Sequence, residues 1–232
     1  MGDFYVDIFA TKGLEYVLVI VFLTSLVLFW RLLNRPGKGT RAIAPAGAQW
    51  QPTVEWFAIA DDRYYHQGHS WVRPDGETMA LVGVDDFAQR LLGAADEILL
   101  PEPGAHVKQG EKAWKLRFGT RYMDLLSPVE GEIVEVNDKV LRSPHLLNED
   151  PYGEGWVARV RSSRLGANLK NLMKGRLAGW WMQETVRSLR EAMSTNPTPV
   201  LQDGGVPVSG LAKAISEDHW EEIAQEFLLV SE

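Results

Sequence analysis

The sequence contains no cysteine, and this absence removes several kinds of chemistry at once. Without thiols the chain has no disulfide framework, no thiolate metal site and no cysteine nucleophile. Positive charge is also in deficit, because 24 lysines and arginines face 31 aspartates and glutamates, which gives a formal net charge of −7. This balance argues against nucleic acid as the main partner.

Apolar residues, by contrast, are abundant, and their longest run covers residues 14–33, with charges only at Glu15 and Arg31. A helix of about 20 residues spans about 30 Å, the thickness of a hydrocarbon core, so the run predicts one transmembrane helix. Tyr16 and Trp30 stand where interfacial aromatic residues belong. A cleaved signal peptide is the alternative, but the residues before the run are acidic rather than basic.

The charges around this run predict its orientation. Acidic residues precede it, and cationic residues end and follow it, which by the positive-inside rule places the N-terminus outside and the remainder in the cytoplasm. We therefore expect a single-pass protein of the bacterial inner membrane, in contact with the lipid bilayer. The cationic residues are Arg31, Arg35, Lys38 and Arg41.

Short β-prone runs separated by turn residues fill residues 56–163. Residues 70–83 predict a hairpin around a Pro-Asp-Gly turn. Residues 85–92 predict a short helix that Asp85 or Asp86 can cap. This pattern is typical of a compact barrel or sandwich of short antiparallel strands.

A series of short motifs runs in order through the same region. It starts with His-Ser-Trp at residues 69–71 and Val-Gly-Val-Asp-Asp at 82–86, and it closes with Asp-Pro-Tyr-Gly at 150–153 and Gly-Trp at 155–156. The series resembles the glycine cleavage system H protein family. The resemblance covers residues 64–160 and implies a mainly-β H-protein or lipoyl-like barrel-sandwich domain.

Members of this family carry lipoate on one lysine at a hairpin tip, within a Glu-Ser-Val-Lys-Ala type of motif. Residues 110–124 match the family without a gap, and this alignment places Thr120 at the lysine position and Arg117 at the glutamate position. A lipoyl amide needs a primary amine, which a threonine hydroxyl does not supply. Lys112 and Lys115 lie earlier on the strand, and a register shift that moved either to the tip would exchange the hairpin's faces. We therefore expect a divergent member without a cofactor.

This hairpin is basic within an acidic chain, and its cations alternate with the aromatic residues Trp114, Phe118 and Tyr122. One interpretation is a docking surface for an acidic protein face or for anionic lipid headgroups. The other is a solvated strand face above a filled core. The cations are Lys112, Lys115, Arg117 and Arg121.

The remaining polar clusters favour structural roles. His66 and His69 are close in sequence, but no carboxylates with recognisable ligand spacing accompany them, so we predict no metal site. The adjacent carboxylates Asp85 and Asp86 suit helix capping better than acid–base catalysis. We therefore predict no catalytic residues and a protein that is not an enzyme.

Two helical segments follow the β domain. Residues 164–194 are basic and amphipathic, with Trp180 and Trp181 near the middle, and this helix either lies along the cytoplasmic leaflet or packs on the β domain. Residues 211–232 form an acidic amphipathic helix that is too short to be stable alone. It docks on its own domain or, as we favour, on another subunit. Its apolar stripe includes Trp220, Ile223 and Phe227.

The fold class that we predict is a single N-terminal transmembrane helix, an H-protein-like β domain and C-terminal helices. The expected order is a short extracytoplasmic segment (1–13), the transmembrane helix (14–33), a linker (34–55), the β domain (56–163), a helical extension (164–194), a second linker (195–210) and the acidic helix (211–232).

This architecture, without redox ligands, favours one function. We expect a non-catalytic, non-lipoylated structural subunit of a bacterial energy-transducing membrane complex, respiratory or photosynthetic, with integral membrane proteins as partners. Two alternatives stay open. One is a lipoyl-carrier protein of a glycine-cleavage-type system, and the other is a stand-alone regulator that binds lipoate-handling enzymes.

Overall fold

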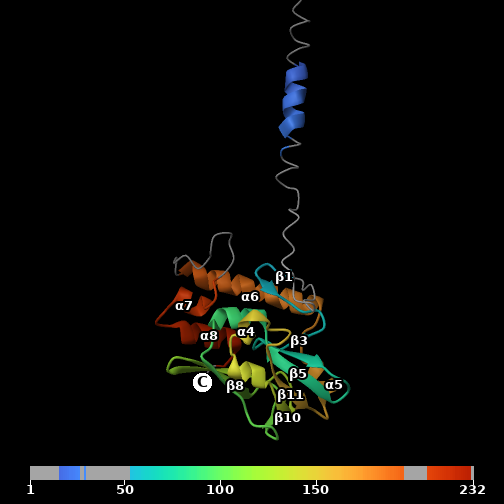
Figure 1. Ribbon diagram of the computed structural model, residues 1–232, viewed down its shortest axis with the longest axis vertical. Coiled ribbons are helices and arrows are strands. Elements are labelled where there is room, and N and C mark those ends of the chain that lie inside the picture. Colours follow the sequence, from blue (N-terminus) through green and yellow to red (C-terminus); the bar gives the residue numbers. More distant parts are fainter. Residues whose placement is uncertain (1–15, 27–28, 30–52, 196–207, 231–232) are drawn as a thin grey trace, which may run out of the picture. The chain divides into compact units, whose positions relative to one another are not determined.

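The computed structural model describes residues 16–26, 29, 53–195 and 208–230 (Figure 1). Residues 1–50 and residues 51–232 form two separate units. In the first unit, residues 16–26 are helical with exposed side chains, and the remainder of the predicted 14–33 span lies almost entirely outside the described residues. Within the described residues, no helix combines the length and the apolar character that crossing a bilayer requires.

The larger sheet of the second unit has six antiparallel strands in the order β3-β4-β5-β11-β10-β7. Strands β4 and β5 form the hairpin predicted for residues 70–83. Strand β5 has neighbours on both sides and is buried at all but its first residue. The strand bounds are β3 Tyr64–Tyr65, β4 Ser70–Pro74, β5 Met79–Val84, β7 His106–Val107, β10 Gly131–Val136 and β11 Trp156–Arg161.

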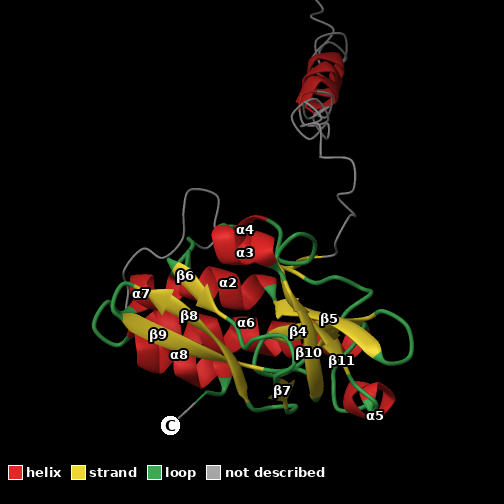
Figure 2. Cartoon of the chain, turned by 60° about the horizontal axis from the view of Figure 1, so that its bottom comes forward, coloured by secondary structure: helices red, strands yellow, loops and turns green. Residues whose placement is uncertain are grey.

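A second sheet has the order β6-β8-β9 and stands apart from the larger one in Figure 2. Its strand β8 alternates as the period-2 pattern predicted, with Trp114, Leu116 and Phe118 buried. The bounds are β6 Glu97–Leu99, β8 Lys112–Phe118 and β9 Arg121–Leu126, and a short ribbon pairs β1 Thr53–Val54 with β2 Phe57–Ala58.

The helix predicted after the hairpin is α2, Asp86–Leu92, and its ends follow local chemistry. The Asp85 carboxylate accepts a hydrogen bond from the Ala88 N–H at 2.8 Å, and Gly93 ends the helix with a φ of 84°. The other helices are α3 Asp138–Arg142, α4 Leu146–Glu149, α5 Leu165–Leu169, α6 Arg176–Thr195, α7 Leu211–Ile215 and α8 Trp220–Leu228.

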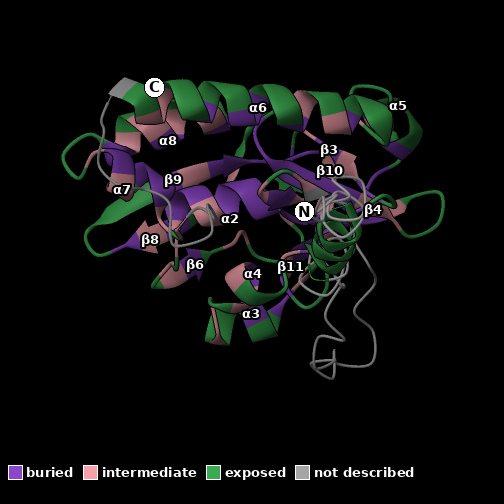
Figure 3. Cartoon of the chain, turned by 90° about the horizontal axis from the view of Figure 1, so that it is seen from above, coloured by how far each residue is buried: buried purple, intermediate pink, exposed green. Residues whose placement is uncertain are grey.

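Helix α6 packs on the β domain, which is one of the two arrangements predicted for this segment. Figure 3 shows α6 along one side of the domain, with exposed residues on its outer surface. Trp180 is 61% exposed on that outer surface, whereas Trp181 is half-buried. The inner face consists of Ala178, Met182, Val186 and Leu189, all of them buried.

The C-terminal helices also pack on the second unit itself, where α7 contacts α2, and α8 contacts both α2 and β9. Trp220, Ala224 and Leu228 of α8 are buried in this interface. Our preference for docking on another subunit was therefore wrong for this apolar stripe. Burial of the stripe within its own chain explains how so short a helix is stable.

Candidate functional site

The tip of the β8–β9 hairpin is the first candidate site, because the family resemblance places the modified lysine there. Phe118 pairs with Arg121, so the turn consists of Gly119 and Thr120. Gly119 has a φ of 63°, which favours glycine, and its N–H donates to the Asp96 carboxylate at 2.6 Å. Thr120 is exposed beside it. The tip therefore presents a hydroxyl on an ordered turn.

Each predicted hairpin cation lies beside a carboxylate of the same chain. The amines of Lys112 and Lys115 are each 3.4 Å from the carboxylate of Asp124. The remaining pairs are Arg117 with Glu97 at 2.7 Å and Arg121 with Glu221 at 3.0 Å. The hydrogen bond to Glu97 raises the pKa of Arg117. These pairs offset the basic charge locally, and a role in docking on protein or lipid stays a prediction.

The C-terminal helices reach the tip end of this hairpin. The rings of Phe118 and Trp220 meet edge to face with centroids 5.6 Å apart. The Lys213 amine of α7 lies 5.3 Å from the Phe118 ring centre and 4.9 Å from that of Trp220. This contact was not foreseen, because about a hundred residues separate the partners and no local pattern links them.

His69 forms a buried pair with Asp85, which the sequence did not indicate. Its Nδ1 lies 2.8 Å from the Asp85 carboxylate, and both side chains are almost fully buried. The imidazole ring has Phe87 at 4.2 Å and Trp181 at 4.6 Å between ring centres. The structural role predicted for His69 is therefore compatible with its contacts.

His66 lies in a different environment from His69. Its Nδ1 accepts a hydrogen bond from the Gly68 N–H at 3.0 Å. Burial, and secondarily the nearby His69, lower the pKa of His66. Among the described residues, no group of three or more His, Asp or Glu side chains is arranged to hold a metal ion.

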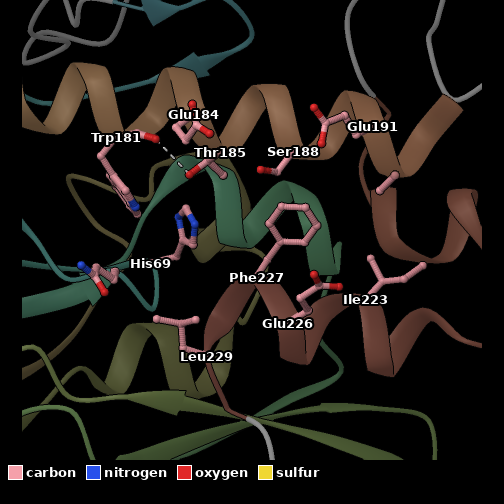
Figure 4. A pocket seen from close by; sticks show the side chains of 12 residues that line it. His69, Trp181, Glu184, Thr185, Ser188, Glu191, Ile223, Glu226, Phe227 and Leu229 are labelled. Carbon is pink, nitrogen blue, oxygen red and sulfur yellow. Dashed lines mark hydrogen bonds between the residues drawn. The ribbon is translucent and has the colours of Figure 1, made fainter.

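Three of the predicted interaction residues line one pocket between α6 and α8 (Figure 4). Trp181 comes from α6, Ile223 and Phe227 come from α8, and the His69 ring lies between Trp181 and Phe227. Trp180, by contrast, is exposed and does not line this pocket. The structure thus divides the adjacent tryptophans between two environments.

The comparisons with known proteins agree on one family. The family described as "Glycine cleavage H-protein" matches residues 63–185. "Glycine cleavage system H protein" of Thermus thermophilus is 43% identical over 108 residues, covering 47% of this chain and 84% of the relative. The protein of the same name from Marinobacter nauticus is 43% identical over 115 residues, covering 50% and 88%. A crystal structure of a glycine cleavage system H protein from Mycobacterium marinum is 34% identical, with a TM-score of 0.42, and covers 45% of this chain and 87% of that chain.

These comparisons correct the main functional expectation. The relatives carry the name of a glycine cleavage component, which contradicts a structural subunit of a respiratory or photosynthetic membrane complex. They favour the first alternative, a lipoyl-carrier protein of a glycine-cleavage-type system. The prediction that the chain is not an enzyme is confirmed, because the H protein is a carrier rather than a catalyst.

Proposed function

Because the chain belongs to the glycine cleavage H-protein family, we propose that its β domain works in a glycine-cleavage-type system. In this proposal, the partners of the domain are proteins that recognise the H-protein fold. The observation that carries the proposal is the family match over residues 63–185, which runs through the hairpin and the closing strand.

The family motifs also interlock in space, which supports retention of the fold. The indole Nε1 of Trp71 donates to the carbonyl oxygens of Val84 at 2.9 Å and Pro151 at 3.0 Å. Gly83 lies against the same indole, where a Cβ would come within 2.5 Å of the ring. Residues from the first, second and closing motifs thus hold one another in place in the interior of the domain.

The residue at the hairpin tip distinguishes between two roles for the domain in such a system. Carriage of a lipoyl group is the role that the family resemblance implies, but Thr120 offers a hydroxyl in place of an amine. This residue favours the second role, a divergent member that binds lipoate-handling enzymes and regulates them without being modified. Lys112 and Lys115 lie on strand β8 of the hairpin, and Lys213 lies beside Phe118 near its tip; a carrier role would have to be sought at amines such as these.

Competition for a lipoate-attaching enzyme tests this role. The full chain, in mild detergent, is added to a reaction in which that enzyme modifies an H protein from the same organism. We expect the modification rate to fall as the chain is added, because both proteins present the same fold. A matched variant with Arg117→Ala and Arg121→Ala, at the hairpin, should compete less well. An unchanged rate at excess chain would refute the proposal.

We further propose that residues 14–33 hold this domain at the inner membrane, with the domain in the cytoplasm. The apolar run and the cations that end and follow it support this placement.

A further inference from the structure

The pocket between α6 and α8 has a volume of about 620 Å³. Volumes of roughly 300–1,000 Å³ are typical of small-molecule sites. Figure 4 shows the His69 ring rising toward α6, between Trp181 and Phe227. His69, Trp181 and Phe227 line the pocket together with exposed residues, most of them polar. Helix α8 lies outside the family match over 63–185, so this pocket is not implied by the family.

The buried imidazole offers the pocket a hydrogen-bond acceptor. Asp85 accepts from the Ala88 N–H with one oxygen and contacts His69 Nδ1 with the other, each at 2.8 Å. A carboxylate only accepts, so Nδ1 carries a proton, and Nε2 keeps its lone pair when the ring is neutral. His69 is 1% exposed, and no hydrogen bond to Nε2 is present among the described residues. An imidazole nitrogen in this state accepts a hydrogen bond from a ligand that donates one.

The rim of the pocket is negatively charged. Glu184, Glu191 and Glu226 line it, and neither lysine nor arginine does. Glu184 pairs with Arg187, whereas Glu191 and Glu226 make no ion pair within the described part of the chain. The rim therefore repels anions and attracts cations. The described pocket residues do not form a metal-binding group, which favours an organic cation over a metal ion.

We propose that this pocket binds a small organic ammonium ion with an apolar body. The ammonium group enters between Trp181 and Phe227 and donates to Nε2 of His69, while the exposed carboxylates of the rim attract it to the pocket. The apolar body packs on Trp181 and Phe227, whose ring faces also attract a cation. This site is separate from the hairpin tip and does not depend on the role proposed for the domain.

Calorimetric titration of the full chain with benzylammonium tests the site. Benzyl alcohol and benzoate have a similar body without the positive charge, and we expect saturable binding of benzylammonium alone. Glu226→Gln should weaken binding by about threefold, the effect of one partly exposed charge. The control Glu222→Gln removes the same charge from an exposed position of α8 outside the pocket and should leave the affinity unchanged.

Nuclear magnetic resonance of the histidine side chains locates the ligand. Benzylammonium should shift the Nε2 resonance of His69 in the wild type. The proposal is overturned by any of three results: no saturable binding of benzylammonium, equal binding of benzyl alcohol, or equal effects of Glu226→Gln and Glu222→Gln. Binding without a shift at His69 overturns it as well. Circular dichroism of both variants confirms that they fold, so a loss of affinity is not a loss of structure.

Discussion

At some positions of the larger sheet, packing permits only one residue type, and Gly83 is the clearest case. A Cβ at this position would lie 2.5 Å from Trp71, whose indole is held by two carbonyl oxygens. The Trp71 ring is buried and has no room to move. The glycine is therefore required by packing rather than by an unusual backbone conformation.

Replacing this glycine should destabilise the domain measurably. Gly83→Ala forces the Trp71 ring to shift, and overpacking of this kind costs about 1–3 kcal/mol. Urea unfolding followed by tryptophan fluorescence measures the loss. The control is Gly166→Ala in α5, where a Cβ would meet no atom within 4 Å. The control should be neutral or slightly stabilising, and an equal loss in both variants would contradict the packing argument.

His66 should make stability depend on pH. Burial lowers the pKa of His66 in the folded state, so the unfolded chain binds a proton more readily. Stability from this group is fully present above the unfolded pKa of about 6.5 and is lost as the pH falls below it. Urea unfolding at pH 7.5 and 5.5 should show a smaller decrease for His66→Gln than for the wild type. His106→Gln, at an exposed histidine, serves as the control and should retain the wild-type decrease.

At the scale of elements, the C-terminal helices close over the hairpin. Trp220 is 4% exposed, and its ring meets Phe118 of β8. Arg121 of β9 pairs with Glu221 of the same helix. The helix is thus part of the domain that it covers, although it lies beyond the family match.

Truncation of the Trp220 side chain tests this packing. Trp220→Ala leaves a cavity beside Phe118 and should lower the free energy of unfolding by about 3–5 kcal/mol. Glu222→Ala, at an exposed position of the same helix, should have little effect. A loss below about 1 kcal/mol for Trp220→Ala, small for a buried tryptophan, would mean that α8 does not pack stably on its own domain.

Local sequence signals account for much of the element arrangement. The hairpin of residues 70–83 follows from its turn residues, and α2 follows from its Asp85 cap. The alternating burial along β8 follows from its period-2 pattern. The contacts of Asp85 with His69 and of Arg121 with Glu221 were not predicted. Their partners are distant in sequence, and packing rather than local propensity brings them together.

At the scale of the whole molecule, the family resemblance gave the correct fold but the setting inferred from the architecture was wrong. The functional prediction gave more importance to the apolar run and the missing lysine than to the series of family motifs. Residues 14–33 lie outside the family match over 63–185, and Thr120 is a single position within it. The residues that hold the fold together therefore identify the family of a domain better than one substituted position or an attached segment does.

Membrane attachment is a prediction at this scale. The full chain should sediment with inner membranes and resist alkaline carbonate extraction, because residues 14–33 are long and apolar enough in sequence to be retained. A variant that lacks residues 1–50, the first of the two structural units, should remain in the supernatant. Recovery of the full chain in the supernatant would contradict the anchor.

The role proposed for the domain is tested most directly by the intact mass of the chain purified after co-expression with a lipoate-attaching enzyme. The wild type should have its unmodified mass, because Thr120 has no amine, whereas the variant with Arg117→Glu and Thr120→Lys should gain one lipoyl group. A lipoyl adduct on the wild type, at any lysine, would contradict the account and establish the chain as a carrier.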